Sequence, residues 1–186
     1  MAFTAYRGAG LFLVAAAMLA GLAACSPLVL SSWGSRVGAN LLPRRAPHAG
    51  VDFSEEHGAP VIAALDGNVR WARDTQGGCG KGVALTHPVA SPKGSRFTLY
   101  CHLDRIDVRA GQAVRRGDEL GRVGTTGNAY GVSHVHFELS STPQSHGDGD
   151  LRDTEDPGLY WAGCFDQQQT YPPDEFLLTY PVRCTK

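Results

Sequence analysis

The stretch GVSHVHFEL (residues 131–139) places two histidines one position apart within an apolar run, and it decides the expected fold. Side chains two positions apart lie on the same face of a β-strand. The apolar side chains of this stretch then face a core, and the polar ones face an open cleft. The core set is Val135, Phe137 and Leu139, and the cleft set is His134, His136 and Glu138. An H-x-H pair alone is equally well explained by two half-exposed histidines, so the rest of the chain must decide.

The rest of the chain predicts short strands. Its 186 residues include 11 prolines and 23 glycines, and this glycine content is above the usual ~7%. Segments of strand character are PVIAAL (60–65), NVRWAR (68–73), GVALTH (82–87), RFTLYCHL (96–103) and both halves of 111–124. Asp66-Gly67 predicts a hairpin between the first two segments. No helical period is sustained after the first 25 residues. We therefore expect an all-β domain, an antiparallel sandwich or open barrel.

A motif upstream of these strands adds two candidate ligands. In PHAGVDF (47–53), His48 and Asp52 have H-x-G-x-D spacing. Gly50 between them permits a tight backbone, so that both side chains can converge.

A fourth histidine lies in TLYCHLD (98–104). Strand alternation places Tyr100 and His102 on the cleft face and Cys101 on the core face. We therefore expect a structural role for Cys101 and a role in the cleft for His102.

The motifs HAGVD, YCHL and SHVHFEL, in this order and spacing, resemble those of the lysostaphin-type (LytM-domain) zinc peptidases, which cut peptide cross-links in peptidoglycan. The resemblance runs from about residue 32 to residue 139. It extends to the intervening segments GAPVIAALDGNV (58–69) and GQAVRRGDELGRVGTTGNAYG (111–131). It implies the lysostaphin-type fold and a zinc-dependent peptidoglycan endopeptidase.

The resemblance also implies residue roles. It assigns one zinc ion per chain to His48, Asp52 and His136, and it makes His102 and His134 catalytic. Two imidazoles and one carboxylate leave a fourth zinc position for water. The chain lacks the H-E-x-x-H motif, whose Glu serves as a base in other zinc peptidases. Imidazoles that titrate near neutral pH can transfer protons instead. Which histidine acts as the base and which stabilises the oxyanion stays open.

Other polar residues are weaker candidates. Glu138 is a candidate to orient a ligand imidazole. His87 is expected at a strand end or lining the cleft, and His57 and His146 are expected in solvent. Tyr100 and Asn128 could touch substrate or serve in packing.

Three rival functions were weighed. Copper–zinc superoxide dismutases need several histidines after H-x-H, and only His146 follows here. A cupin needs a Glu three or four residues beyond H-x-H and a later His, whereas Glu138 comes two residues after His136. A non-catalytic LytM-type domain would bind cell wall and activate an amidase. All five metal-site positions are present, which favours an enzyme. A net charge of −1 without a basic stripe argues against nucleic acid as a partner, and the oligomeric state stays open.

The first 24 residues are interpreted as a lipoprotein signal peptide. An apolar core shorter than the ~20 residues of a spanning helix ends at Leu-Ala-Ala-Cys. Cys25 is then the lipidated first residue, and residues 25–30 form a short tether to a lipid bilayer. Ser26 resembles the residue found there in lipoproteins sent to the outer membrane of Gram-negative bacteria, so we expect its periplasmic face. The alternatives are an uncleaved anchor or a cut elsewhere.

Four further cysteines suggest two disulfides in an exported protein. Three pairings exist, and we favour Cys79–Cys101, which flank one expected hairpin, with Cys164–Cys184 pinning the tail. The peptidase domain is expected over residues 31–140, and a loop-rich extension over 141–186 packs on it. The extension either walls the groove or, as we slightly favour, covers a sheet edge. Its acidic segment 141–169 reads as a solvated loop, with a calcium site as the alternative.

Overall fold

Antiparallel strand pairing organises the domain, as the sequence predicts. The computed structural model describes residues 26–144 and 151–184. The strands are β1 (Val29–Ser31), β2 (Val51–Ser54), β3 (Pro60–Ile62), β4 (Gly67–Asp74), β5 (Lys81–Thr86), β6 (Phe97–Ile106), β7 (Ala113–Val114), β8 (Glu119–Val123), β9 (His134–Ser140), β10 (Thr154–Glu155), β11 (Trp161–Gly163) and β12 (Leu178–Thr179). Two short 3-10 helices, η1 (Leu151–Asp153) and η2 (Pro157–Leu159), flank β10.

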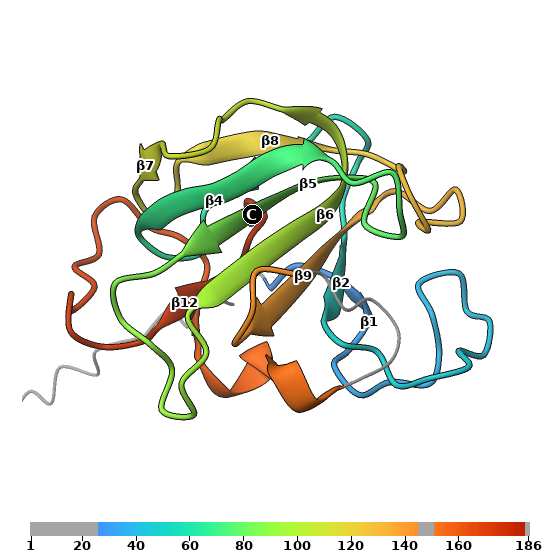
Figure 1. The fold of residues 1–186 in the computed structure, drawn as a ribbon, viewed down its shortest axis with the longest axis horizontal. Coiled ribbons are helices and arrows are strands. Elements are labelled where there is room, and N and C mark those ends of the chain that lie inside the picture. The colour runs from blue at the N-terminus through green and yellow to red at the C-terminus, as the bar shows by residue number, and fades with distance from the viewer. Residues whose placement is uncertain (1–25, 145–150, 185–186) are drawn as a thin grey trace, which may run out of the picture.

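The main sheet contains ten strands, of which seven follow the order β1-β2-β9-β6-β5-β4-β7 (Figure 1). Strand β6 is its branch point. The first half of β6 pairs with β9, and its second half pairs with β8, which in turn pairs with β3. One strand thus belongs to both layers of an open antiparallel barrel. This confirms the expected all-β class.

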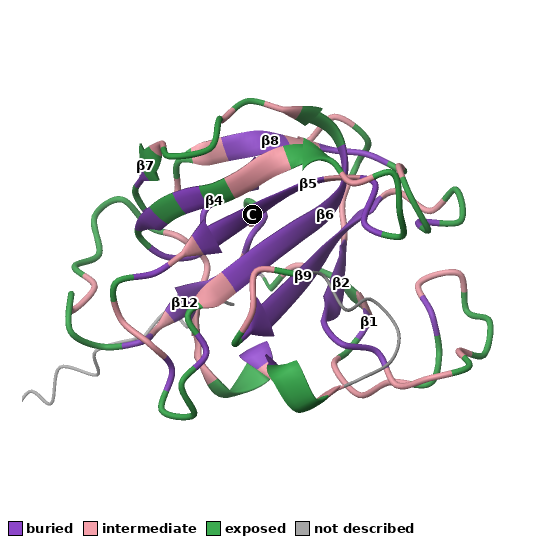
Figure 2. Cartoon of the chain, viewed as in Figure 1, coloured by how far each residue is buried: buried purple, intermediate pink, exposed green. Residues whose placement is uncertain are grey.

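The core lies between these layers, and its central strands are buried along most of their length (Figure 2). Val135, Phe137 and Leu139 all belong to the core cluster. The predicted alternation of β9 is therefore confirmed. It follows that the polar face of β9 is turned away from the core.

The hairpin predicted at Asp66-Gly67 is wrong. Strand β3 pairs with β8, whereas β4 pairs with β5 and β7. The turn moves the chain from one layer to the other because Asp66 is held from both sides. Its carboxylate accepts from the backbone N–H of Arg116, and its carbonyl accepts from His87 Nδ1.

The segment expected as an extension forms part of the fold. Strand β10 pairs with the end of β9, and Val182 bridges to Val61 in β3. Phe176, Leu178 and Val182 belong to the core cluster. These contacts cover two sheet edges, and the tail also completes the core, which a surface cover would not do. Among the described extension residues, Pro143 and Gln144 also line the groove discussed below.

The expected tether needs a correction at its end. Val29 and Leu30 lie in β1, which pairs with β2, so the ordered sheet already begins within residues 25–30. The signal peptide and Cys25 lie outside the described residues. Within those that are described, no helix is long and apolar enough to cross a membrane.

Both favoured disulfides are present. Cys79, just before β5, is bonded to Cys101 in β6, and Cys164 is bonded to Cys184 near the end of the tail. The first bond ties the loop before β5 to β6, and the second lies within the tail.

Candidate metal centre

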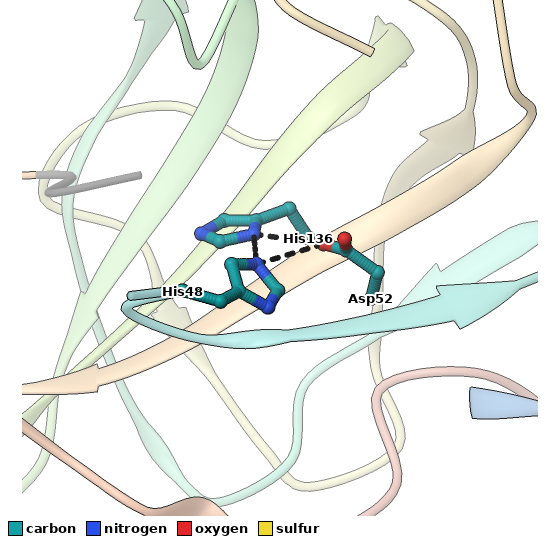
Figure 3. A group of neighbouring side chains, drawn as sticks. All are labelled: His48, Asp52 and His136. Atoms are coloured by element: carbon teal, nitrogen blue, oxygen red, sulfur yellow. Dashed lines mark hydrogen bonds and ion pairs between the residues drawn. The ribbon is translucent and has the colours of Figure 1, made fainter. Parts of the chain in front are cut away.

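Three buried side chains meet where β2 lies beside β9 (Figure 3). The register sets Asp52 opposite His136, and directly opposite residues of an antiparallel pair share a face. His48 reaches the same point from the loop before β2. His48 Nε2 and His136 Nδ1 lie 2.9 Å apart, and Asp52 Oδ1 lies 3.2 Å from the first and 2.9 Å from the second. In the described part of the chain, this is the one group of His, Cys, Asp and Glu that could hold a metal.

The donor set fits zinc. Zinc bonds of ~2.0–2.1 Å in tetrahedral geometry separate the ligand atoms by about 3.3 Å. The three observed distances of 2.9, 2.9 and 3.2 Å are close to that spacing. Two imidazoles with one carboxylate also match a catalytic zinc site, which keeps a fourth position open.

The second polar atom of each ligand side chain is also held. The contacts are His48 Nδ1 to the Ser31 hydroxyl and the Ser32 carbonyl at 3.1 Å each, His136 Nε2–H to Glu138 Oε1 at 2.8 Å, and Arg44 to Asp52 Oδ2 at 2.8 Å. Such partners fix the tautomer and orientation of metal ligands. Each ring therefore turns one defined nitrogen toward the other two ligand atoms, and Glu138 lies where the sequence analysis expects it.

The close approach of the H-x-G-x-D loop to β9 requires glycine. A Cβ on Gly50 would lie 2.3 Å from the carbonyl oxygen of Phe137 and 2.9 Å from Cε1 of His136. Any larger residue would push the loop off the strand. The loop could then no longer bring His48 to its partners.

Burial and mutual hydrogen bonds shift the pKa values of the three side chains in the metal-free centre. Burial alone would lower the pKa of His136, but hydrogen bonds to Asp52 and Glu138 raise it to about 10. Burial would raise the pKa of Asp52, but hydrogen bonds from His136 and His48 hold it well below its usual range. Burial lowers the pKa of His48. At neutral pH the metal-free centre therefore has a protonated His136, a neutral His48 and an ionised Asp52.

Zinc binding at pH 7.5 is expected to release about one proton, because His136 must become neutral to bind the metal. The apparent zinc affinity should then rise about tenfold per pH unit up to the pKa of about 10. The stability of the metal-free fold depends on pH in the opposite direction. The charged His136 stabilises this fold most below pH 6.5, and the stabilisation is lost as pH rises through about 10. Calorimetric titration in two buffers of different ionisation enthalpy measures the proton count, and a count of zero would contradict the assignment.

The two remaining site histidines lie beside the ligands. The ring centroids of His102 and His134 are 4.8 Å apart, and His134 Nε2 lies 3.6 Å from Asp52 Oδ1. His102 Nδ1–H donates to the carbonyl of Thr126, and His134 Nδ1–H to that of Val132, each at 2.8 Å. Both rings therefore keep Nε2 as the basic nitrogen. Burial lowers the pKa of both, that of His102 to about 3, so both are neutral at physiological pH.

The predicted faces of β6 before His102 are wrong. Tyr100 is opposite Phe137 and lies in the core, and Cys101 is opposite His136 on the side of the metal centre. A bulge explains the reversal, because Cys101 and His102 together face the single residue Gly82 between two regular pairs. His102 has φ +67°, which changes the alternation, so that Leu103 returns to the core. His102 reaches the site through this bulge.

The metal centre forms the floor of a groove of about 920 Å³. Its walls come from the loop 38–46, from β4, from the loop before β5 and from residues 128–130. Asp52 is the one carboxylate among the described lining residues, and it is paired with Arg44. Arg45 and Arg73 add positive charge, and Arg73 lies over the ring of Trp71.

Of the weaker candidates from the sequence, one lines the groove and the others that the structure describes lie outside it. Asn128 lines the groove. Tyr100 is a core residue, and its hydroxyl accepts from the backbone N–H of Ala64. His87 lies just past the end of β5, buried between Asp66 O and Thr98 Oγ1 and outside the groove. His57 is exposed, as expected, and His146 lies outside the described residues.

Arg44 and the carbonyls of Thr126 and Val132 were missed by the sequence reasoning. Backbone acceptors have no sequence signature, because every residue carries a carbonyl. Arg44 lies in an irregular loop with no periodicity that would place it against Asp52.

The fold and site together fit a β-sheet metallopeptidase, with three buried side chains that could hold a metal at the base of a groove and two neutral histidines beside them. The chain belongs to peptidase family M23, whose family model matches residues 46–148. This confirms the resemblance stated from the motifs.

Known proteins agree with this assignment. The chain is 37% identical over 117 residues to the peptidoglycan DD-endopeptidase ShyA of Vibrio cholerae, a match over 59% of this chain and 25% of ShyA. A zinc-containing peptidase from Vibrio cholerae has TM-score 0.51 and 32% identity over 68% of this chain and 37% of its own. The catalytic domain of lysostaphin from Staphylococcus simulans shares the fold, with TM-score 0.51 and 23% identity over 71% and 87% of the two chains. This chain thus spans about a quarter of the curated relative.

Proposed function

We propose that this protein uses one zinc ion to hydrolyse peptide cross-links in peptidoglycan. The observation that carries this proposal is the convergence of His48, Asp52 and His136 on one point, beside two histidines whose Nδ1–H groups are held by backbone carbonyls. When bound, zinc would polarise the scissile carbonyl and acidify water. ShyA, which is named for cutting peptidoglycan, supports the substrate class.

His102 and His134 supply the proton transfers of this reaction. Hydrolysis adds the oxygen of water to the carbonyl carbon, breaks the C–N bond and moves one proton to the leaving nitrogen. A neutral imidazole can take the proton from water at Nε2 and return it to the nitrogen. The carbonyls of Thr126 and Val132 hold each Nδ1–H, so each ring presents its basic nitrogen. A non-catalytic, amidase-activating domain would need none of this arrangement.

Digestion of purified sacculi by a protein of residues 26–186 tests the function. We expect cross-linked muropeptides to be replaced by monomers, with one zinc per chain. A His134→Ala protein serves as the inactive comparison, and a His57→Ala protein, altered at an exposed histidine away from the groove, serves as the matched control. Unchanged muropeptides in the presence of bound zinc would reject the proposal.

The charge of the groove suits acidic peptides. Arg45 and Arg73 have no carboxylate partner among the described residues, and the free carboxylates of cross-linked stems would face them. Exposed charge pairs contribute about 0.2–1 kcal/mol each. The double variant Arg45→Ala/Arg73→Ala should therefore raise KM about three- to tenfold with little change in kcat, and less so in high salt. Arg70→Ala, an exposed change on β4 outside the groove, should alter neither. Equal effects of the two variants would contradict this.

We further propose that Cys25 is lipidated and anchors the protein to the periplasmic face of the outer membrane. Three residues separate Cys25 from β1, so the catalytic groove would work close to that membrane. Incorporation of labelled palmitate into the wild-type protein, but not into Cys25→Ser, tests the anchor. Sucrose-gradient fractionation of the two membranes tests its location.

A further inference from the structure

The bulge that presents His102 is held by a disulfide. Cys101 precedes His102 directly, is fully buried, and is bonded to Cys79. The backbone carbonyl of Cys79 also accepts a hydrogen bond of 2.9 Å from the backbone N–H of His102. One residue of the loop before β5 thus holds both positions of the bulge, one covalently and the other through its main chain.

The same loop supports the carbonyl that orients the His102 ring. Residues 78–80 pack directly on residues 126–128, and the backbone N–H of Asn128 donates to the carbonyl of Gly78. A Cβ on Gly127 would lie 2.3 Å from the carbonyl oxygen of Gly78, so the contact allows no side chain. Thr126, whose carbonyl accepts from His102 Nδ1–H, also accepts from the backbone N–H of Lys81 through its hydroxyl. The disulfide-bonded loop therefore fixes both the backbone of His102 and its ring.

Regular strand geometry would not place His102 in the groove. A positive φ is uncommon for a residue with a side chain and persists only where the surroundings impose it. If His102 relaxed to ordinary strand dihedrals, the alternation of β6 would change and its ring would turn away from His134. The bulge is therefore a conformation that needs an external constraint.

We propose that the Cys79–Cys101 disulfide is the positioning device for His102, and that opening it impairs proton transfer while leaving the zinc ligands in place. Both cysteines are proposed as positioning residues: Cys101 is fully buried, and Cys79 lies in the groove wall formed by the loop before β5. The ligand side chains His48, Asp52 and His136 are held from outside the loop 75–80, by the partners Ser31, Arg44 and Glu138. The inference rests on the proposed function, because it takes His102 as catalytic.

The double variant Cys79→Ala/Cys101→Ala should keep one zinc per chain and lower kcat about 10- to 100-fold, within the contribution of a positioned acid–base group. KM should change less than kcat does, because Cys79 is one of many residues that line the groove. The matched control is Cys164→Ala/Cys184→Ala, which removes the tail disulfide far along the chain from His102. It should retain near wild-type kcat although its thermal midpoint falls.

A reversible test avoids dependence on the folding of the variant. The folded, zinc-loaded Cys164→Ala/Cys184→Ala protein has one disulfide left in the described chain, and a phosphine reductant converts it to two thiols. After removal of the reductant, the reduced protein should hold zinc but show the lowered kcat, and reoxidation should restore the rate. Full activity with two thiols verified by mass would overturn the proposal, and so would loss of zinc together with activity.

A spectroscopic measurement separates this inference from the proposed function. The Nδ1 proton of His102, hydrogen-bonded to the carbonyl of Thr126, should give a downfield NMR signal in the oxidised protein. Reduction should shift or broaden this signal and leave that of His134 unchanged. An inactive wild-type protein with this behaviour would reject the peptidase function but keep the positioning role. An active protein whose His102 signal does not change on reduction would keep the peptidase function and reject the positioning role of the disulfide.

Discussion

A His136→Ala protein is expected to lose its zinc and its hydrolytic activity together. His136 is the ligand at the centre of the cluster, since its Nδ1 lies 2.9 Å from both His48 Nε2 and Asp52 Oδ1. Removing it leaves two protein ligands where a catalytic zinc site needs three. Zinc per chain, measured by atomic emission after dialysis, should fall below about one tenth. kcat/KM on cross-linked muropeptides should fall by about 10³-fold or more, because the carbonyl and water lose their activating metal.

The same substitution should also destabilise the metal-free fold. Glu138 is fully buried and Asp52 nearly so, and both bond to His136. Removing one partner of a buried charged pair costs about 3–5 kcal/mol. His136→Asn, whose amide can still contact a carboxylate, separates loss of ligation from misfolding. Retention of one zinc and a tenth of the activity by a folded His136→Asn or His136→Ala protein would disprove the ligand assignment.

The outcome for β9 shows what periodicity can predict. Its alternation from His134 to Leu139 is regular, so a two-residue period assigned every face correctly. The segments named as strands correspond to β3 through β9, because apolar alternation bounded by glycine and proline reports local burial directly. The pairing of Asp52 with His136 was reachable only through the resemblance, since 84 residues separate them.

The errors have a common physical origin. A bulge adds one residue to a strand without altering composition, so nothing in TLYCHLD reveals that Tyr100 faces the core. Similarly, Asp66-Gly67 has the composition of a hairpin turn, but hydrogen bonds from the distant residues Arg116 and His87 decide its direction. Both the bulge in β6 and the course of the chain at Asp66-Gly67 depend on partners far away in the sequence. Local pattern is therefore reliable for the existence of strands and unreliable for the connections and irregularities between them.

The burial of the C-terminal tail also depends on long-range partners. The extension 141–186 is expected to wall the groove or cover a sheet edge, yet Phe176, Leu178 and Val182 complete the core. These apolar residues are spaced without a strand or helix period, so their burial becomes visible only once β3 is placed beside them. A truncation at the expected domain boundary after residue 140 would therefore expose core side chains.

A His134→Ala protein is expected to keep its zinc and lose turnover. His134 Nε2 lies 3.6 Å from Asp52 Oδ1, outside hydrogen-bonding distance, so the three ligand side chains do not depend on it. Its Nδ1 is fixed by the Val132 carbonyl, and burial lowers its pKa, so the ring is a neutral base at pH 7. Loss of a positioned acid–base group lowers kcat by about 10²–10⁴-fold, and KM should change little. Near wild-type turnover by this variant would remove His134 from the mechanism.

The double variant His102→Ala/His134→Ala decides whether the two histidines act on one proton path. If one takes the proton that the other returns, removing either stops the same sequence, and the double variant should be no slower than the slower single variant. If one is the base and the other stabilises the oxyanion, the losses should multiply. The two rings pack with centroids 4.8 Å apart, and each donates its Nδ1–H to a separate carbonyl, so both present an unprotonated Nε2. An oxyanion needs a hydrogen-bond donor, and neither neutral ring carries a proton on Nε2, so we expect the double variant to be no slower than the slower single variant while zinc stays near one per chain.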